Sequence, residues 1–133
     1  MSADRYLLDT SAILTLMEGE DGADEVEKIL RESEAIVPFP VLLETYYISL
    51  QEGSESVADE RYAWLRHIPV IEIWSMDEPT LLTAAHIKAR SHVSFANALI
   101  AAFAVRNQAI LVHKDPEFEV MTDRVRQRRL PYK

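Results

Sequence analysis

The sequence predicts an α/β fold, a three-layer sandwich in which helices cover both faces of a central parallel sheet of about five strands. Two observations support this prediction. Short apolar runs rich in Val, Ile and Leu alternate along the chain with longer segments whose apolar residues recur every three or four positions. Because strands that are apolar throughout must be buried on both faces, and because helices separate them, a parallel sheet is the expected arrangement.

The first half of the chain is expected to contribute two strands and four helices. Strands are predicted at 6–8 and 35–37, and helices at about 12–17, 23–30, 40–50 and 57–68. Gly19 is a stop signal for the first helix, and Pro38 follows the second strand. Pro40 and Gly53 are suited to open and close the third helix, because proline fits the first turn of a helix and glycine fits its C-terminal cap.

The second half is expected to contribute three strands and two helices. Strands are predicted at 70–74 and 109–112, with a fifth near Leu130, and helices at about 78–90 and 94–107. Ligands of a parallel sheet bind beyond the carboxyl ends of its strands, at the point where the strand order reverses. Asp9 and Asp115 follow the first and fourth predicted strands. Their carboxylates are expected to face one crevice if these two strands flank the reversal.

Length and composition limit the chemistry that is open to the chain. With 133 residues it is expected to form one domain, 1–133. The absence of cysteine excludes disulfides, thiolate zinc sites and cysteine nucleophiles, so that oxygen or histidine ligands must hold any metal. No apolar run approaches the roughly 20 residues of a membrane span, and no leader pattern is visible at the N-terminus. We therefore expect a cytoplasmic protein with no membrane association.

The net charge of −8 is unevenly distributed along the chain. A negative chain is a poor partner for nucleic acid in general, since Lys and Arg drive phosphate binding. The segment 118–133, however, carries a local charge of +3. Its candidate RNA-binding residues are Arg124, Arg126, Arg128 and Arg129. Contact with an RNA backbone and a solvated basic tail are equally good interpretations of this segment.

Four oxygen-bearing side chains stand where an apolar element ends or is interrupted. They are Asp9, Glu44, Asn97 and Asp115, separated by 35, 53 and 18 positions. No local motif links residues so far apart, so only a folded domain can bring them together. Hard divalent cations prefer oxygen ligands. The pattern therefore predicts a divalent-metal site.

Asp9 and Glu44 also have structural interpretations. Asp9 could cap a helix that follows its strand, and the hydroxyls of Thr10 and Ser11 could hold either its carboxylate or the water shell of a metal. Glu44 lies on a helical face that looks buried, since its neighbours at helical spacing include Val41. A buried carboxylate is costly unless it is paired or binds a cation, so a salt bridge, perhaps to an arginine, is the alternative there.

The other two candidates have structural interpretations as well. Asn97 lies three residues after Ser94, a spacing typical of a capped helix N-terminus, which makes a cap the alternative to a metal ligand. Asp115 precedes Pro116, where a turn residue is the alternative.

The four segments together closely resemble the PIN-domain ribonucleases, most of all the VapC-type toxins of prokaryotic toxin–antitoxin pairs. The matching segments are Leu-Leu-Asp-Thr-Ser-Ala-Ile-Leu at 7–14, Val-Leu-Leu-Glu at 41–44, Ser-Phe-Ala-Asn-Ala-Leu-Ile-Ala-Ala at 94–102 and Ile-Leu-Val-His-Lys-Asp-Pro-Glu-Phe at 110–118. The resemblance spans almost the whole chain, in the order and at the spacing typical of the family. Any one segment would be a weak signal, whereas four together are a strong one.

The resemblance implies a PIN-like fold and Mg²⁺- or Mn²⁺-dependent hydrolysis of phosphodiester bonds in single-stranded or structured RNA. A toxin of this kind is held inactive by a cognate antitoxin protein, and toxins of this family commonly form homodimers. The resemblance assigns Asp9, Glu44 and Asp115 as metal ligands and places Asn97 at the fourth position of the catalytic set. Thr10, Ser11, Ser94 and Glu117 would support the site, with Glu117 as an outer ligand.

The sequence departs from the family pattern at two positions. Asn97 replaces the usual aspartate, so the site keeps an oxygen but loses a charge, and metal affinity should fall. An engineered change, a naturally weakened nuclease and compensation by Glu117 would each explain this residue. His113 stands where Ser or Thr is common; it would either contact phosphate or serve as an ordinary histidine at a strand end.

Other functions fit less well. The alternative from another class is a catalytically weakened PIN-fold module that binds RNA or a protein partner without cutting. A haloacid-dehalogenase-like phosphatase would need an aspartate where Ser11 stands. A nucleotide-binding fold would need a glycine-rich turn after the first strand, and the glycines are at 19, 22 and 53. A receiver domain would need an aspartate at the end of the third strand, where Trp74 and Ser75 stand.

Overall fold

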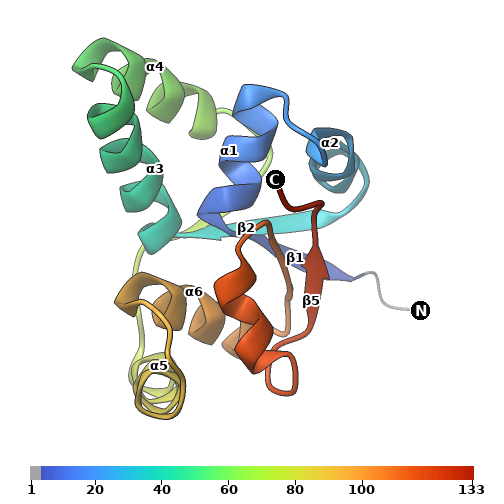
Figure 1. Ribbon diagram of the computed structural model, residues 1–133, viewed down its shortest axis with the longest axis vertical. Helices are drawn as coiled ribbons and strands as arrows, with labels where there is room; N and C mark the ends of the chain where they lie inside the picture. Colours follow the sequence, from blue (N-terminus) through green and yellow to red (C-terminus); the bar gives the residue numbers. More distant parts are fainter. Residues whose placement is uncertain (1–3) are drawn as a thin grey trace.

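The computed structural model describes residues 4–133 and contains one five-stranded sheet in the order β3-β2-β1-β4-β5. The strands are β1 (Arg5–Leu8), β2 (Glu34–Pro38), β3 (Ile71–Ile73), β4 (Ile110–His113) and β5 (Gln127–Arg129). The helices are α1 (Thr10–Glu18), α2 (Ala23–Glu32), α3 (Phe39–Glu52), α4 (Glu55–Leu65), α5 (Glu78–Arg90), α6 (Phe95–Arg106) and the 3-10 helix η1 (Pro116–Met121). Every neighbouring pair of strands is parallel. Figure 1 shows helices on both sides of this sheet, which confirms the predicted fold class.

One element was not expected, and the fifth strand lies close to where it was expected. The 3-10 helix η1 was not predicted, because the six residues 116–121 are too few for a helical apolar pattern to be recognised. The fifth strand lies just before Leu130, at Gln127–Arg129. It is one of the two edge strands of the sheet, with two exposed arginines, whereas Leu130 after it is fully buried. Residues 127–129 of the basic segment are thus part of the sheet, and the two arginines among them are exposed at its edge.

The strand order reverses between β1 and β4, which lie side by side at the centre of the sheet. Leu8 is paired with Val112, and the next residue, Asp9, donates its backbone N–H to Val112 O at 3.0 Å. The two strands therefore end together. This confirms that they flank the reversal, and it brings the segments after them to the same edge of the sheet.

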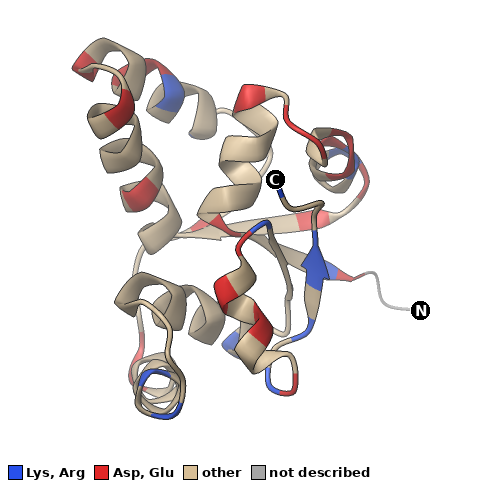
Figure 2. Cartoon of the chain, in the orientation of Figure 1, with Lys and Arg blue, Asp and Glu red and all other residues tan. Residues whose placement is uncertain are grey.

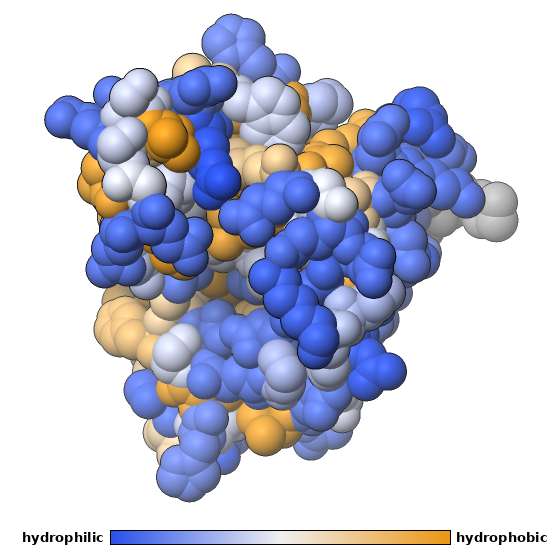
Figure 3. Space-filling model, turned by 45° about the horizontal axis from the view of Figure 1, so that its top comes forward, coloured by the Kyte–Doolittle hydropathy of each residue, from blue (hydrophilic) through white to orange (hydrophobic). Residues whose placement is uncertain are grey.

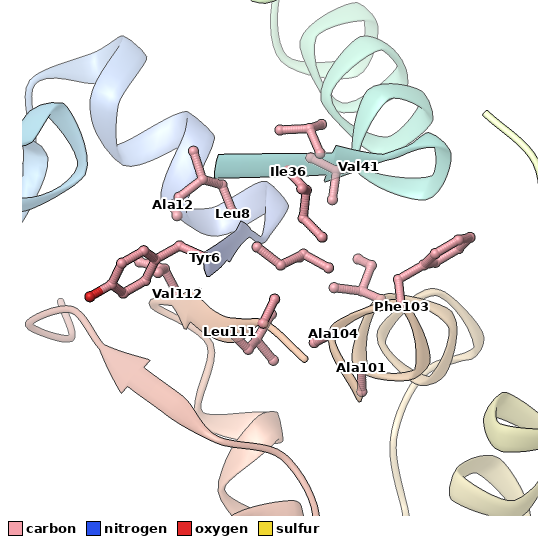
Figure 4. Packing of buried hydrophobic residues seen from close by; sticks show 14 of the residues in the cluster. Tyr6, Leu8, Ala12, Ile36, Val41, Ala101, Phe103, Ala104, Leu111 and Val112 are labelled. Carbon is pink, nitrogen blue, oxygen red and sulfur yellow. The ribbon is translucent and has the colours of Figure 1, made fainter. Parts of the chain in front are cut away.

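A single hydrophobic cluster lies between the sheet and its helices and fixes the positions of the strand ends. Leu8, Leu111 and Val112 are fully buried, as Figure 4 shows for the cluster around them. Burying a side chain of this size contributes roughly 1.5–3 kcal/mol. Helix α6 covers the face of these strands that lies away from α1, and it packs closely through small residues such as Ala101 and Ala104. The strand ends that carry the polar residues are thus held rigidly from both faces.

The apolar helix α6 has 12 residues, and no helix within residues 4–133 is long and apolar enough to cross a lipid bilayer.

Candidate functional site

The polar residues predicted from the four segments converge on one cavity of about 360 Å³ beyond the carboxyl ends of β1 and β4. It is lined by Asp9, Thr10, Ser11, Leu14, Glu44, Ile48, Ser94, Asn97, Asp115 and Glu117. The structure thus brings together all four main candidates and four of the supporting residues. His113 and the four arginines are not part of the cavity wall.

Asp9 is buried at the junction of β1 and α1, with 2% of its surface exposed. It caps α1: its Oδ2 accepts the backbone N–H of Ser11 at 3.1 Å and the Ser11 hydroxyl at 2.5 Å. Its Oδ1 is buried and has no hydrogen-bond partner among residues 4–133. The pKa of Asp9 is raised to about 7, mainly by burial. The charges of Glu44 and Asp115 also raise this pKa, whereas the hydrogen bonds from Ser11 lower it.

Glu44 reaches the same cavity from α3. Its Oε1 accepts the hydroxyl of Thr10 at 2.7 Å, so its partner is a hydroxyl and not the arginine of the structural alternative. The face around it is only partly buried, because Val41 is buried but Tyr47 is 40% exposed. Burial raises the pKa of Glu44, and the charges of Asp115 and Glu117 act in the same direction. Glu44 is therefore a half-buried acid among other acids.

Asn97 lies in the first turn of α6, and its side chain does not cap the helix. The capping group is the Ser94 hydroxyl, which accepts the backbone N–H of Asn97 at 3.1 Å. The interpretation of Asn97 as a cap is therefore wrong. Its amide Nδ2 donates instead to Asp115 Oδ2 at 3.0 Å and to Glu117 Oε1 at 2.8 Å. The amide thus lies between two carboxylates that come from a distant part of the chain.

Asp115 and Glu117 are fixed at the start of η1. Asp115 caps this short helix, since its Oδ1 accepts the backbone N–H of Glu117 at 2.9 Å. Glu117 Oε1 in turn accepts the backbone N–H of Ser94 at 2.6 Å. These bonds connect the segment after β4 to the beginning of α6.

His113 supports Asp115 from inside the core. Its Nδ1 accepts the backbone N–H of Asp115 at 3.1 Å, which requires the proton of the neutral ring to be on Nε2. Nε2 lies 2.8 Å from Gln127 Oε1 and donates to it. The ring is fully buried, and this burial lowers the pKa of His113. It is thus a neutral histidine at a strand end, as one of the two interpretations proposed, and it does not reach the cavity.

The four candidate arginines lie around β5, where Figure 2 shows basic residues. Arg124 donates to the Ser91 hydroxyl at 2.5 Å, and Arg126 donates to a backbone oxygen at 3.2 Å. Arg128 stacks over the Tyr6 ring, and Arg129 pairs with Glu119 at 3.2 Å. Each side chain therefore already has a contact within the protein.

The donor set of the cavity suits a hard divalent cation. Its ligand atoms are oxygens, and a buried, unpartnered carboxylate oxygen such as Asp9 Oδ1 is the kind of atom that a cation would satisfy. Within residues 4–133, however, no three acidic or histidine side chains lie close enough together to surround an ion. One oxygen of Asp9 and one of Asp115 already accept hydrogen bonds, from Ser11 and from Asn97 respectively.

Sequence reasoning missed one apolar residue of the cavity wall, Leu14, which lies three positions after Ser11 on α1. Ile48, four positions after Glu44 on α3, is the helical neighbour of Glu44 that the sequence places on the same face. Helical spacing could have indicated Leu14 as well, because residues three or four apart share a helix face. No local signal could have indicated the bond between Asn97 and Glu117, which depends on tertiary structure alone.

Several solved structures with a similar fold are described as toxin–antitoxin proteins. VapBC2 from Rickettsia felis, bound to a DNA fragment from its promoter, matches with a TM-score of 0.79 and 13% identity over 96% of this chain and 99% of that chain. VapBC-1 from nontypeable Haemophilus influenzae matches with a TM-score of 0.73 and 20% identity over 94% and 97%. VapC20 from Mycobacterium tuberculosis, a sarcin-ricin loop cleaving toxin, matches with a TM-score of 0.68 and 15% identity over 86% and 93%.

At such low identities these similarities show the fold alone. None of the curated proteins compared with this sequence matches it. The family model of the PIN domain matches residues 6–123, which include all four segments that converge on the cavity. The chain therefore belongs to the PIN-domain family.

Proposed function

We propose that this protein is a divalent-metal-dependent endoribonuclease that hydrolyses phosphodiester bonds in single-stranded or structured RNA, and that it is the toxin of a toxin–antitoxin pair. One observation carries the proposal: Asp9, Glu44, Asn97 and Asp115 line a single cavity at the reversal of the strand order in a PIN-domain chain. Residues 1–133 would act as one domain, in the cytoplasm, where RNA is available.

Asp9, Glu44 and Asp115 are the proposed ligands of Mg²⁺ or Mn²⁺, directly or through water. The raised pKa values of Asp9 and Glu44 are caused mainly by burial and to a lesser extent by neighbouring acids, and they support this assignment because a cation would stabilise the charged form of these carboxylates. When bound, such an ion activates water for in-line attack and neutralises charge on the leaving oxygen. Asn97 can offer an amide oxygen but no charge.

The remaining polar residues of the site are proposed to orient these ligands. Ser11 holds one oxygen of Asp9 and leaves Oδ1 free, and Thr10 holds Glu44 toward the cavity. His113 fixes the backbone of Asp115 from the core. The apolar side chains of Leu14 and Ile48 restrict water on the side of the cavity between α1 and α3.

The substrate has to bind despite the acidic cavity, so contacts with its phosphates must come from outside it. Arg124, Arg126, Arg128 and Arg129 remain the proposed contacts. Arg126 and Arg129 are the most exposed of those that form ion pairs, with 63% and 62% of their side chains accessible. Surface ion pairs of this kind are weak, so a phosphate can replace the acidic partner at little cost.

A cognate antitoxin is the proposed protein partner, since the structural relatives include toxin–antitoxin complexes.

A homodimer is proposed as well. Leu43, Tyr47 and Leu50 are spaced along one face of α3 and are 62%, 40% and 40% exposed. Between α5 and α6 lies an apolar cavity of about 270 Å³. Figure 3 shows that hydrophobic residues also reach the surface between hydrophilic ones, and apolar patches of this kind mark interaction surfaces.

The direct test is cleavage of single-stranded RNA in Mg²⁺ or Mn²⁺ by the unaltered chain, by Asn97→Asp and by Asp9→Asn. We expect Asn97→Asp to cut, Asp9→Asn to be inactive and the unaltered chain to be slow or silent, because Asn97 lacks the charge of an acid. If no variant cuts any RNA tested, including structured RNA, the enzymatic proposal fails.

The second candidate function is a PIN-fold module that binds RNA or a protein without cutting. Asn97 favours it, because its amide donates to two carboxylates that would otherwise be free to bind metal. Thermal melting in millimolar Mn²⁺ distinguishes the two functions, since a ligand that binds only the folded state raises the melting temperature. A rise supports the nuclease, and no change supports the binding module.

A further inference from the structure

The side-chain amide of Asn97 uses both of its hydrogens on carboxylates. An amide nitrogen carries two hydrogens. One is donated to Asp115 Oδ2 at 3.0 Å and the other to Glu117 Oε1 at 2.8 Å. Asn97 is buried, with 6% of its surface exposed, and its backbone is held by the Ser94 hydroxyl. The amide therefore has a fixed position between two acids.

These contacts form a closed ring. The backbone N–H of Glu117 donates to Asp115 Oδ1, which joins the two acids to each other as well as to Asn97. The backbone N–H of Ser94 adds a second donor to Glu117 Oε1. The ring connects the end of β4 to the first turn of α6. It holds two carboxylates side by side through hydrogen bonds from the Asn97 amide and from two backbone N–H groups.

An aspartate at position 97 could not take part in this ring. An ionised carboxylate has no hydrogen to donate and would face Asp115 and Glu117 as a third negative charge. Like charges within hydrogen-bond distance and partly out of water repel strongly. A chain with that residue would need a cation in the cavity to hold the three acids together.

We propose that Asn97 is a positioning residue whose amide takes the place of a cation between Asp115 and Glu117, so that the acidic cavity is assembled without metal. This inference rests on the proposed function, because it concerns the same metal site. The amide already supplies a partial positive charge to one oxygen of each acid, Asp115 Oδ2 and Glu117 Oε1. A cation at Asp115 would therefore meet a carboxylate whose charge is partly compensated.

The test compares melting temperatures of the full chain and of Asn97→Asp, each in EDTA and in millimolar Mn²⁺. In EDTA, Asn97→Asp should melt roughly 5 °C or more below the unaltered chain, as expected for a broken buried network. In Mn²⁺ most of that loss should be regained, so that Mn²⁺ raises the melting temperature of the variant more than that of the unaltered chain. Gln51→Glu adds the same charge at an exposed position of α3 and should show neither effect.

A second variant keeps the test decisive if Asn97→Asp does not fold in EDTA. Asn97→Asp combined with Glu117→Gln exchanges the amide and the carboxylate and leaves the net charge unchanged. Its new amide can donate to position 97, so the double variant should fold in EDTA and recover part of the lost melting temperature. A merely structural role of Asn97 would lower the melting temperature of Asn97→Asp equally in EDTA and in Mn²⁺.

Two results would overturn the inference: Asn97→Asp melts like the unaltered chain in EDTA, or its loss is as large in Mn²⁺ as in EDTA. A double variant that stays unfolded in EDTA would do the same. This test uses only the difference between Asn97→Asp and the unaltered chain in the melting shift caused by Mn²⁺, whereas RNA cleavage tests the proposed function, so the two can fail separately. If the protein cuts RNA but Asn97→Asp loses as much melting temperature in Mn²⁺ as in EDTA, the proposed function stands and the proposed role of Asn97 is refuted.

Discussion

The hydroxyl of Thr10 donates a hydrogen bond of 2.7 Å to Oε1 of Glu44, and this bond joins the first residue of α1 to the middle of α3. Thr10 is buried, whereas Glu44 is half-buried at the cavity. The bond opposes the effect of burial on Glu44, because a donor to a carboxylate stabilises its ionised form. Thr10 therefore helps to keep Glu44 charged.

Thr10→Val is expected to raise the pKa of Glu44 further and to lower metal affinity at neutral pH. The substitution preserves the shape of the side chain and removes the hydroxyl donor. The free energy of unfolding should fall by about 1–3 kcal/mol, because a partly buried carboxylate is left without this partner. The measurement is Mn²⁺ affinity by calorimetry between pH 5 and 8. The affinity of the variant should require a higher pH than that of the unaltered chain.

Thr45→Val is the matched control for this substitution. Thr45 is fully buried in the same helix as Glu44, and its hydroxyl has no hydrogen-bond partner among residues 4–133. Replacing an unpartnered buried hydroxyl by a methyl group should leave the free energy of unfolding unchanged or raise it by up to about 1 kcal/mol. Metal affinity should not change. An equal loss of affinity in both variants would mean that the Thr10 bond is not the cause.

The buried carboxyl of Asp9 should make the metal-free protein less stable as the pH rises. Its pKa is raised from 3.8 to about 7, so between these values the folded state holds a proton that the unfolded state has lost. The free energy of unfolding should therefore fall from about pH 4 to pH 7, and the full change corresponds to roughly 4 kcal/mol. Urea unfolding in EDTA across this range measures it.

Asp9→Asn should remove most of this pH dependence and stabilise the metal-free protein at pH 7, because the amide stays neutral in both states. The same variant should gain no stability from Mn²⁺, since it has lost a charged ligand. If Asp9→Asn and the unaltered chain unfold with the same pH dependence in EDTA, another group is responsible for the slope.

The fold was predictable because its signals are local. Apolar runs such as 35–37 and helical periodicity in the segments between them depend only on neighbouring residues. The edge strand β5 was harder to place, since Arg128 and Arg129 are exposed and resemble a solvated segment. What identifies this strand is its pairing with β4, which no pattern in the sequence records.

The candidate site was predictable in its members but not in their contacts. Asp9 and Asp115 could be expected at one crevice because they follow strands of a parallel sheet. Asn97 was interpreted as a cap because Ser94 stands at capping distance, and this interpretation was right for Ser94 alone. The partners of the Asn97 amide lie 18 and 20 positions away, so that only the folded chain reveals them.

His113 is expected to lower stability in acid. Burial lowers its pKa below the usual 6.5, so as the pH falls from 6.5 the unfolded state takes up a proton before the folded state does. A proton on Nδ1 would also face the backbone N–H of Asp115. The contribution should be measured as the stability difference between Asp9→Asn and the double variant Asp9→Asn, His113→Gln, because the raised pKa of Glu44 acts in the opposite direction in both proteins. This difference should be constant above pH 6.5 and shift below it toward lower relative stability of the protein that keeps His113; a difference that stays constant down to pH 5 would contradict this role.

Leu43→Glu is expected to convert a homodimer into a monomer without unfolding it. Leu43 is the most exposed apolar residue of α3, at 62%, and surface substitutions of this kind change the free energy of unfolding by about 0.5 kcal/mol or less. A charge at the centre of an apolar interface, however, would have to be buried unpaired. Sedimentation of the variant measures the mass, with Val120→Glu on η1, 55% exposed, as the matched control. If Leu43→Glu sediments like the unaltered chain, the α3 face is not the dimer interface.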